Sequence, residues 1–265
     1  MSPAKKRLTL IELALLLTLN LLATDLVLAQ KRPTGRKSEI TFKISVPLEF
    51  KGRVVSGSLR KSEITRLLDL PVRNGDSNPN EGYGVEMTRS NGEKFMAYSC
   101  VQWEKAKSEG AYTASTFDMA MESSMIHTCG LLFELQRARP PLKSFVVKPK
   151  VSLADLNLIP AKILAHIPED DEEEKQLSRS TMSEVVTRDD IEQAEDKIIT
   201  LSYGGFRQSI WEAARADFNG DGVEDILVFT AGRAEGGTMG FSDYFLLTRT
   251  DPTGPLKLIE TRNSK

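Results

Sequence analysis

The residues in this sequence with the clearest chemistry form one short run that is rich in carboxylates and glycine. The run reads Asp217-Phe218-Asn219-Gly220-Asp221-Gly222-Val223-Glu224-Asp225. Side chains that carry oxygen stand at its positions 1, 3, 5 and 9, and a glycine stands at position 6. Calcium is a hard cation that takes about six to eight oxygen ligands, and alternate side chains of a tightly wound loop can point to one centre. Because Gly222 permits the sharp turn that this arrangement needs, the run predicts a loop that binds one calcium ion.

The position at which the run ends distinguishes between two kinds of calcium loop. An EF-hand loop needs a carboxylate at its position 12, but position 12 here is Val228, within the apolar stretch Ile226–Phe229. The pattern D-x-N-x-D-G-x-x-D, followed at once by a predicted strand, resembles instead the loop of FG-GAP and VCBS-type repeats, known from integrin-like β-propellers. The resemblance implies side-chain ligands at Asp217, Asn219, Asp221 and Asp225 and a backbone carbonyl ligand at Val223.

The number and kind of these ligands indicate what a bound ion does. Glu224 lies outside the pattern and is expected to face solvent. Three carboxylates and one amide suggest a dissociation constant of roughly 10⁻⁶–10⁻³ M. We therefore expect a structural role, in which calcium holds a hairpin whose loop otherwise frays. The alternative is a metal-free turn between two strands, in which the three carboxylates repel one another.

The N-terminal residues predict export from the cytoplasm. Residues 5–7 are basic, and the apolar stretch Leu8–Ala23 follows them. Residues 27–29 then offer small side chains at the positions that a signal peptidase reads, with Gln30 as the mature start. Residues 1–29 are therefore interpreted as a signal peptide, and the mature protein is expected to be periplasmic or secreted, without stable membrane insertion.

Two alternatives for this segment stay open. Glu12 and Asp25 are acidic where a signal peptide prefers none. An uncleaved transmembrane anchor is one alternative, although carboxylates are costly in hydrocarbon. Residues 8–13 also resemble the start of a type IV prepilin, with Arg7 where that family has glycine. This resemblance implies a pilin-like surface subunit anchored by residues 8–29.

Composition limits the class of protein. Hydrophobic residues make up 40% and charged residues 27% of the 265 residues, which is typical of a globular protein and not of a disordered one. The formal net charge is -2. Phosphate recognition needs a basic face, so nucleic acid is not an expected partner.

Cys100 and Cys129 are the two cysteines of the chain. In an oxidising compartment such an isolated pair most often forms a disulfide, which stabilises the fold by roughly 3–4 kcal/mol on the chain-entropy account. Two buried free thiols are the alternative.

Hydrophobic periodicity predicts a mixed N-terminal part. We expect strands at 38–50, 53–59, 131–135 and 144–147, a helix over 62–68 capped by Ser62, a hairpin of 85–89 and 93–98, a helix over 116–127 that begins at Ser115, and a helical turn at 152–158. Asn91-Gly92 at the hairpin turn is a strong signal because both residues tolerate positive φ. The disulfide is expected to tie the helix over 116–127 to the end of the hairpin.

The acidic run 168–174 is typical of a solvated linker, since its charges repel one another. We expect a polar helix over 188–197 capped by Thr187. The strands expected after it are 197–203, 208–216, 226–230, 244–250 and 256–261, joined as an antiparallel meander, with a glycine-rich turn at 232–240. The predicted class is α+β, with an α+β domain over 30–165, an acidic linker over 166–190 and a β-rich calcium-binding part over 191–265.

A catalytic apparatus is not predicted. His127 and His166 lack metal-ligand spacing, and a disulfide at Cys129 excludes it as a nucleophile. Ser58-Leu59-Arg60-Lys61 matches S-x-x-K, but its companion motifs are missing. We therefore expect a non-enzymatic exported protein that binds one structural calcium ion and has a protein or glycan partner. A hydrolase with an unrecognised active site is the alternative.

Overall fold

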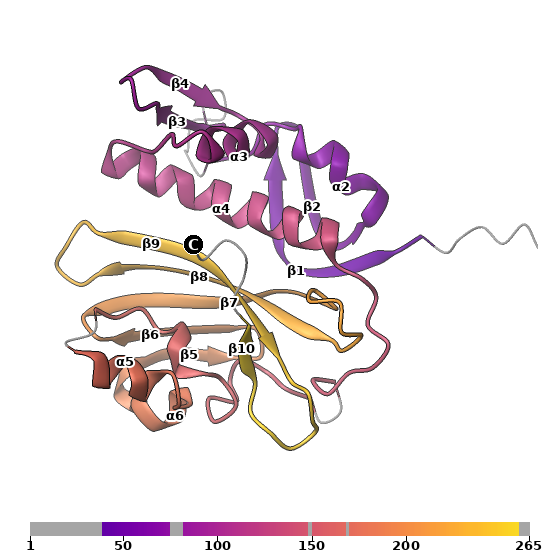
Figure 1. The fold of residues 1–265 in the computed structure, drawn as a ribbon, viewed down its shortest axis with the longest axis vertical. Coiled ribbons are helices and arrows are strands. Elements are labelled where there is room, and N and C mark those ends of the chain that lie inside the picture. The colour runs from indigo at the N-terminus through magenta and orange to yellow at the C-terminus, as the bar shows by residue number, and fades with distance from the viewer. Residues whose placement is uncertain (1–38, 75–81, 148–149, 168–169, 260–265) are drawn as a thin grey trace, which may run out of the picture. The chain divides into compact units, whose positions relative to one another are not determined.

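The computed structural model describes residues 39–74, 82–147, 150–167 and 170–259 (Figure 1). The predicted signal peptide, residues 1–29, lies outside these ranges. Among the described residues, no helix is both long enough and apolar enough to cross a membrane.

An antiparallel sheet of eight strands is the centre of the fold. Its strands are β1 (Thr41–Phe50), β2 (Arg53–Arg60), β5 (Ile191–Glu195), β6 (Ile198–Tyr203), β7 (Phe206–Ala216), β8 (Asp225–Ala234), β9 (Gly240–Thr248) and β10 (Lys257–Ile259). The order along the main path is β10-β9-β8-β7-β1-β2, and β6, which carries β5 on its other side, also pairs with β7. The predicted C-terminal antiparallel meander is thereby confirmed.

The strand β7 is where the sheet divides. On one side it pairs with β8 over its whole length, and on the other its first half pairs with β6. Beyond that half, Ala214 pairs with Ile44 of β1. The register of β7 against β8 shifts between Glu212 and Ala214, and such a bulge bends a strand. One long strand can therefore hold two different neighbours along one edge.

The strand β8 is buried on both faces because apolar residues run through it without alternation. Leu227 and Phe229 belong to one hydrophobic cluster, and Ile226 and Val228 belong to a second. Successive side chains of a strand point to opposite faces, so the two clusters lie on opposite sides of the sheet. A strand of this kind occupies the middle of a layered fold.

Helices cover both faces of the sheet (Figure 1). They are α2 (Lys61–Leu68), α3 (Cys100–Ser108), α4 (Thr116–Arg137), α5 (Asp171–Leu177) and α6 (Met182–Val185), with 3₁₀ turns η1 (Ala161–Ile163) and η2 (Arg188–Asp190). Buried residues of α2, α3 and α4 belong to the first cluster, and those of α5 and α6 belong to the second.

The helix α4 begins where the sequence predicts. The Ser115 hydroxyl accepts a hydrogen bond from Asp118 N at 3.0 Å, which caps the first turn. The helix continues to Arg137, so the prediction of a strand at residues 131–135 is wrong. Leu131, Leu132 and Leu135 are fully buried, and their three- and four-residue spacing puts them on the helix face that packs against the sheet.

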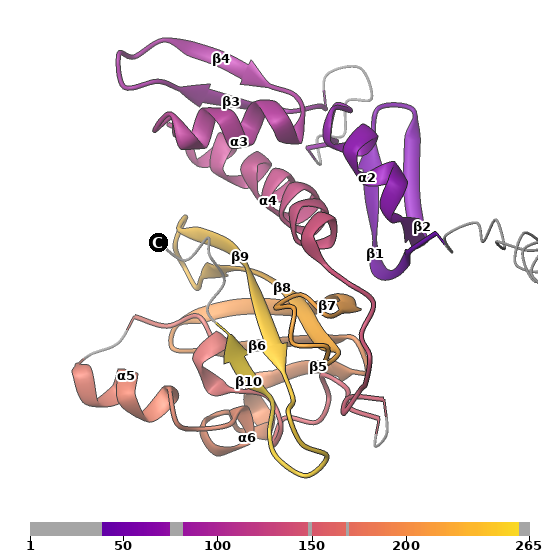
Figure 2. The ribbon, with the colours of Figure 1, turned by 45° about the vertical axis from the view of Figure 1, so that its right-hand side comes forward.

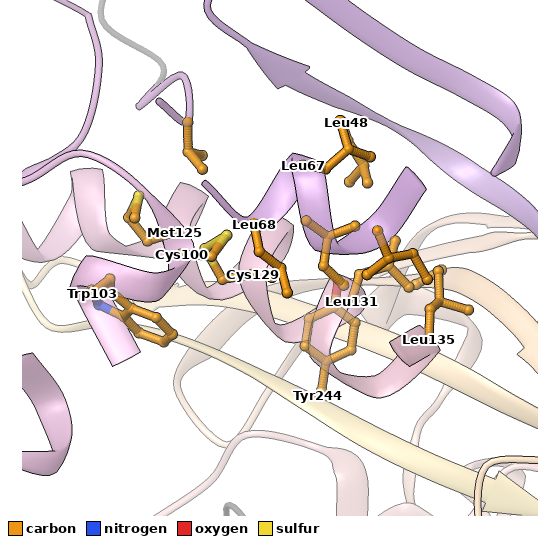
Figure 3. Close-up of a cluster of buried hydrophobic side chains, with 14 of the residues drawn as sticks. Leu48, Leu67, Leu68, Cys100, Trp103, Met125, Cys129, Leu131, Leu135 and Tyr244 are labelled. Carbon is orange, nitrogen blue, oxygen red and sulfur yellow. A yellow bond between two sulfur atoms is a disulfide. The ribbon is translucent and has the colours of Figure 1, made fainter. Parts of the chain in front are cut away.

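A disulfide joins Cys100 of α3 to Cys129 of α4, with 5.1 Å between the Cα atoms, and confirms that prediction. Figure 3 shows the two sulfur atoms bonded among buried apolar side chains, near Met125 and Leu68. The hairpin of β3 (Val85–Thr88) and β4 (Lys94–Ala97) is also confirmed and leads directly into α3. The helix α3 itself was not predicted.

Tyr244 of β9 packs tightly against α4. Its hydroxyl donates to the His127 carbonyl at 2.7 Å. A Cβ atom on Gly130 would lie 2.6 Å from the Tyr244 ring, so only glycine fits at this place in the helix. In Figure 3, Tyr244 lies directly beneath Leu131.

Three short segments differ from the sequence prediction. The helix α2 begins at Lys61, so Ser62 lies inside it and is not its cap; Arg60 holds that position. Residues 144–147 form a turn and not a strand, since the Ser144 hydroxyl accepts bonds from Val146 N and Val147 N. The polar helix predicted over 188–197 is the 3₁₀ turn η2 followed by strand β5. Thr187 is the N-cap residue of η2, and it donates its N–H and its hydroxyl to the Asp190 carboxylate at 2.7 Å.

Residues 171–174 of the acidic run, which was expected to be a solvated linker, belong to the helix α5. The Asp170 carboxylate accepts Glu172 N and Glu173 N at 3.0 and 2.9 Å and so caps α5. Carboxylates in the first turn of a helix interact favourably with its dipole, and Leu177 at its end is buried. Local capping and one apolar anchor therefore outweigh the repulsion between like charges.

The sheet also crosses the predicted boundary between an N-terminal and a C-terminal domain. Strands β1 and β2, from the predicted domain 30–165, join β7, from the predicted part 191–265. Ile40–Lys265 form one compact unit by their contacts.

Candidate calcium site

The run Asp217–Asp225 forms the connection between β7 and β8. Ala216 is the last residue of β7, and Asp225 is the first of β8. Gly220 and Gly222 have φ values of 85° and 82°, in the left-handed region that other residues rarely adopt. The two glycines therefore allow the chain to turn sharply twice within the loop, as the sequence predicted for Gly222.

Asp217 organises the inner side of this loop. Its carboxylate is buried, and it accepts Gly220 N at 2.7 Å and Gly222 N at 3.1 Å, one on each oxygen. An ionised carboxylate has about four acceptor sites. Two of them are used here, so each oxygen keeps capacity for a cation.

Asn219 and Asp221 form the exposed half of the loop. Asn219 Oδ1 accepts Asp221 N at 2.9 Å, and Asp221 Oδ1 accepts Val223 N at 2.7 Å. Asn219 Nδ2 donates to Asp221 Oδ2 at 3.1 Å. These local bonds hold both side chains close to the turn, in the manner of the metal-free alternative described above.

Asp225 is the residue whose surroundings are unusual. It is fully buried, and its Oδ2 accepts Phe218 N at 3.0 Å. Burial raises the pKa of Asp225 to about 6, and the nearby charge of Asp221 adds to the rise while the Thr248 hydroxyl partly offsets it. Neither Asp225 Oδ1 nor Thr248 Oγ1 has a hydrogen-bond partner of ordinary geometry among the described residues.

The segment that follows α4 packs along the loop (Figure 2). Arg139 and Asp217 exchange two backbone hydrogen bonds of 2.9 and 3.0 Å, and the Gly222 carbonyl accepts Leu142 N and Lys143 N. Glu224 N in turn donates to the Lys143 carbonyl at 2.9 Å. The loop is thus held from outside by a segment more than seventy residues earlier in the sequence.

The sequence predicted that Glu224 faces solvent, but the structure gives it a specific contact. Its side chain is partly buried and accepts the Ser144 hydroxyl at 2.5 Å. The sequence could not reveal this contact, because Ser144 belongs to the same distant segment.

The predicted ligand residues are therefore together in one loop, with Asp217, Val223 and Asp225 buried and Asn219 and Asp221 exposed. Over the residues that the structure describes, no three side chains of His, Cys, Asp or Glu form a group suited to a metal ion. The donor set fits calcium by its chemistry, since hard oxygen ligands predominate.

The residues considered for catalysis have structural partners instead. His127 packs against Phe229 with ring centroids 4.8 Å apart, and burial lowers its pKa to about 4. Cys129 is in the disulfide. His166 Nε2 lies 3.1 Å from Glu174, and Lys61 donates to the Ala138 carbonyl at 2.6 Å.

The sequence did not predict the hollows that the described residues line, and two of them contain buried polar residues. One of about 590 Å³ adjoins the loop and is lined by the buried Glu212, its ion-pair partner Arg215 at 2.7 Å, and Ser45. The other, of about 410 Å³, is lined in part by Thr230 and Asp243 of the sheet. Thr230 follows directly on the apolar run Ile226–Phe229 of β8, and this change to a polar residue is a signal in the sequence that could have indicated the second hollow.

Comparison of the chain with protein-family models, with curated proteins and with solved structures finds no match.

Proposed function

We propose that this chain is an exported, non-enzymatic binding protein in which one calcium ion stabilises the loop Asp217–Asp225. The observation that supports the metal most directly is the buried Asp225 carboxylate, one oxygen of which has no partner among the described residues. A buried polar group without a hydrogen bond costs about 1–3 kcal/mol, and more when it is charged. A cation bound to that oxygen would remove this cost.

The ligands in this proposal are the side chains of Asp217, Asn219, Asp221 and Asp225 and the carbonyl of Val223. Calcium would supply positive charge and would act as a common partner for their oxygens. Asp217 and Asp225 already hold the loop from its buried side through backbone N–H groups. Binding then requires mainly that the exposed Asn219 and Asp221 turn inward.

The position of the loop favours a structural role over a sensing role. It connects β7 to β8, the strand buried on both faces, and its backbone is bonded to the segment after α4. A rigid surrounding of this kind leaves little room for a large calcium-driven movement. The ion would instead fix the end of β8 and the neighbouring segment.

Export is supported by the disulfide, since such bonds persist in oxidising compartments and are rare in the cytosol. The proposed location is the periplasm or the outside of the cell. A binding role is favoured over catalysis because two of the residues considered for catalysis make structural contacts. Cys129 is in the disulfide, and Lys61 donates to the Ala138 carbonyl.

Thermal unfolding with calcium and with a chelator tests the metal. At free calcium about 100 times the dissociation constant, binding stabilises the fold by about 2.7 kcal/mol. In a domain of this size that corresponds to a rise in Tm of roughly 5–10 °C. Asp221→Ala should abolish the rise, whereas in the metal-free protein it removes only the local bonds of an exposed side chain with Val223 N and Asn219.

Glu224→Gln is the matched control, since it removes a neighbouring carboxylate that is not among the proposed ligands. It should keep the full calcium-dependent rise in Tm. The metal proposal fails if calcium does not raise the Tm of the wild-type protein, or if Asp221→Ala retains the rise.

A further inference from the structure

A hollow on the face of the sheet opposite α4 combines features of a small-molecule site. It lies between the segment 163–167 and strands β8 and β9, and its volume is about 410 Å³. Thr230 of β8 and Asp243 of β9 are directly opposed in the sheet register, so both side chains point to the same face. A hollow of this size is within the range of ligand pockets, about 300–1,000 Å³.

Aromatic rings form much of its wall. Phe206, Phe241 and Phe245 all line it, and the first two meet edge to face with centroids 5.8 Å apart. Ile167 and Met239 also line it and are 68% and 51% exposed. Exposed apolar side chains beside a hollow lined by aromatic rings indicate that an apolar ligand gains from binding there.

Two buried side-chain atoms near this wall, a hydroxyl oxygen and an amide nitrogen, have no hydrogen-bond partner among the described residues. Thr230 is 1% exposed and lines the hollow, yet its hydroxyl makes no hydrogen bond with any described residue. Gln208, also 1% exposed, lies opposite Gly232, two residues from Thr230 along β8. Its Oε1 accepts Ala165 N at 2.5 Å, whereas its Nε2 has no partner among the described residues. Unsatisfied groups of this kind are rare in folded proteins.

The charge of the lining is negative. Asp243 is its one carboxylate, and neither Lys nor Arg is among the residues that line it. Within the described residues the Asp243 side chain accepts its neighbour Tyr244 N at 2.7 Å and is in no ion pair. His166, the other titratable residue of the lining, is bonded to the Leu164 carbonyl and to Glu174.

We propose that this hollow, hereafter the Asp243 pocket, binds a small organic cation, with the ammonium group at Asp243 and the apolar part among the phenylalanine rings. A cation is attracted both by a carboxylate and by the faces of aromatic rings. The inference extends the binding role proposed above, and it does not depend on calcium at the distant loop.

The test compares choline with 3,3-dimethyl-1-butanol, which has a similar shape but no charge. Binding of each is measured by calorimetry or by ligand-observed NMR, using the mature protein in saturating calcium. Choline should bind at least about ten-fold more tightly than the neutral alcohol. Asp243→Asn should weaken choline about ten-fold and leave the alcohol unchanged.

Two further variants complete the experiment. Asp189→Asn removes one exposed carboxylate away from the Asp243 pocket and should leave choline binding unchanged. Thr230→Val keeps the shape of the side chain and should leave choline binding unchanged while the Tm stays the same or rises, because a buried hydroxyl without a partner is removed.

Equal binding of choline and the alcohol overturns the proposal, as does unaltered choline binding by Asp243→Asn, or no binding of choline at millimolar concentration. Repeating the titration in a chelator separates this result from the metal proposal. Choline binding that persists without calcium supports the Asp243 pocket even if calcium proves not to bind.

Discussion

Asp225 differs from the other buried carboxylates of this protein in what surrounds it. Glu122 accepts Trp103 Nε1 and the Thr113 hydroxyl and lies 3.1 Å from Lys107 Nζ. Glu212 is paired with Arg215. Asp225 accepts Phe218 N but has no ion-pair partner among the described residues, and its Oδ1 makes no hydrogen bond with them. Buried charges are ordinarily paired or bound to a metal, so Asp225 is the carboxylate for which a metal partner is expected.

His127 supplies a prediction about pH at the same scale. Burial lowers its pKa from 6.5 to about 4. Between pH 4 and pH 6.5, His127 is therefore protonated in the unfolded chain and neutral in the folded chain. Stability should therefore fall as pH decreases from about 6.5 to about 4, by up to about 3 kcal/mol from this residue. Above pH 6.5 the residue contributes no pH dependence.

Urea unfolding between pH 4 and pH 7 measures this effect. His127→Gln cannot take up the proton and should flatten the pH dependence over that interval. An identical slope in wild type and His127→Gln would show that other groups are responsible.

At the scale of the element, the disulfide connects one helix that the sequence predicted to one that it did not. The helix α4 carries a clear apolar stripe and a cap, whereas α3 was not predicted. Cys100 is the first residue of α3 and packs with Trp103 in the first hydrophobic cluster (Figure 3). The covalent bond therefore ties α3 to the longest helix among the described residues.

Removing this bond should cost roughly 3–4 kcal/mol on the chain-entropy account. The double variant Cys100→Ser/Cys129→Ser should melt roughly 7–15 °C below the wild-type protein. A reducing agent should lower the Tm of the wild type and leave that of the double variant unchanged. A wild-type Tm that does not respond to reductant would contradict the prediction.

At the scale of the whole molecule, the unit from Ile40 to Lys265 has a sheet whose strands come from both predicted domains. Strands β1 and β7 pair, and α4 packs against β9, so one hydrophobic cluster contains residues from each. Elements that share a buried cluster gain their stability together. We therefore expect one cooperative unfolding transition.

The two tryptophans of the chain can report on that transition separately. Trp103 lies in α3 and Trp211 lies in β7. The variants Trp103→Phe and Trp211→Phe each leave one reporter, and each should unfold in a single transition that coincides with its own circular dichroism curve. Separate transitions for fluorescence and circular dichroism would instead support two independent domains.

Much of the local structure could be predicted because it depends on neighbouring residues. Asn91-Gly92 specifies its hairpin turn, Ser115 caps α4, and the glycines of the calcium-type loop take the positive φ that their type allows. The pairing of Cys100 with Cys129 follows from their being the two cysteines. Each of these features depends on a few adjacent residues or on one possible pairing.

The sequence by itself therefore predicted the Asn91-Gly92 turn, the Ser115 cap and the pairing of the two cysteines, and it is the basis for proposing which residues bind calcium. The tertiary structure alone decided that residues 131–135 continue a helix, that β1 joins β7, and that Oδ1 of the buried Asp225 has no hydrogen-bond partner among the described residues. It also brought Thr230 opposite Asp243 in the Asp243 pocket. These outcomes depend on register and packing between segments far apart in the chain. The free energy of such long-range contacts cannot be inferred from a pattern of neighbouring residues.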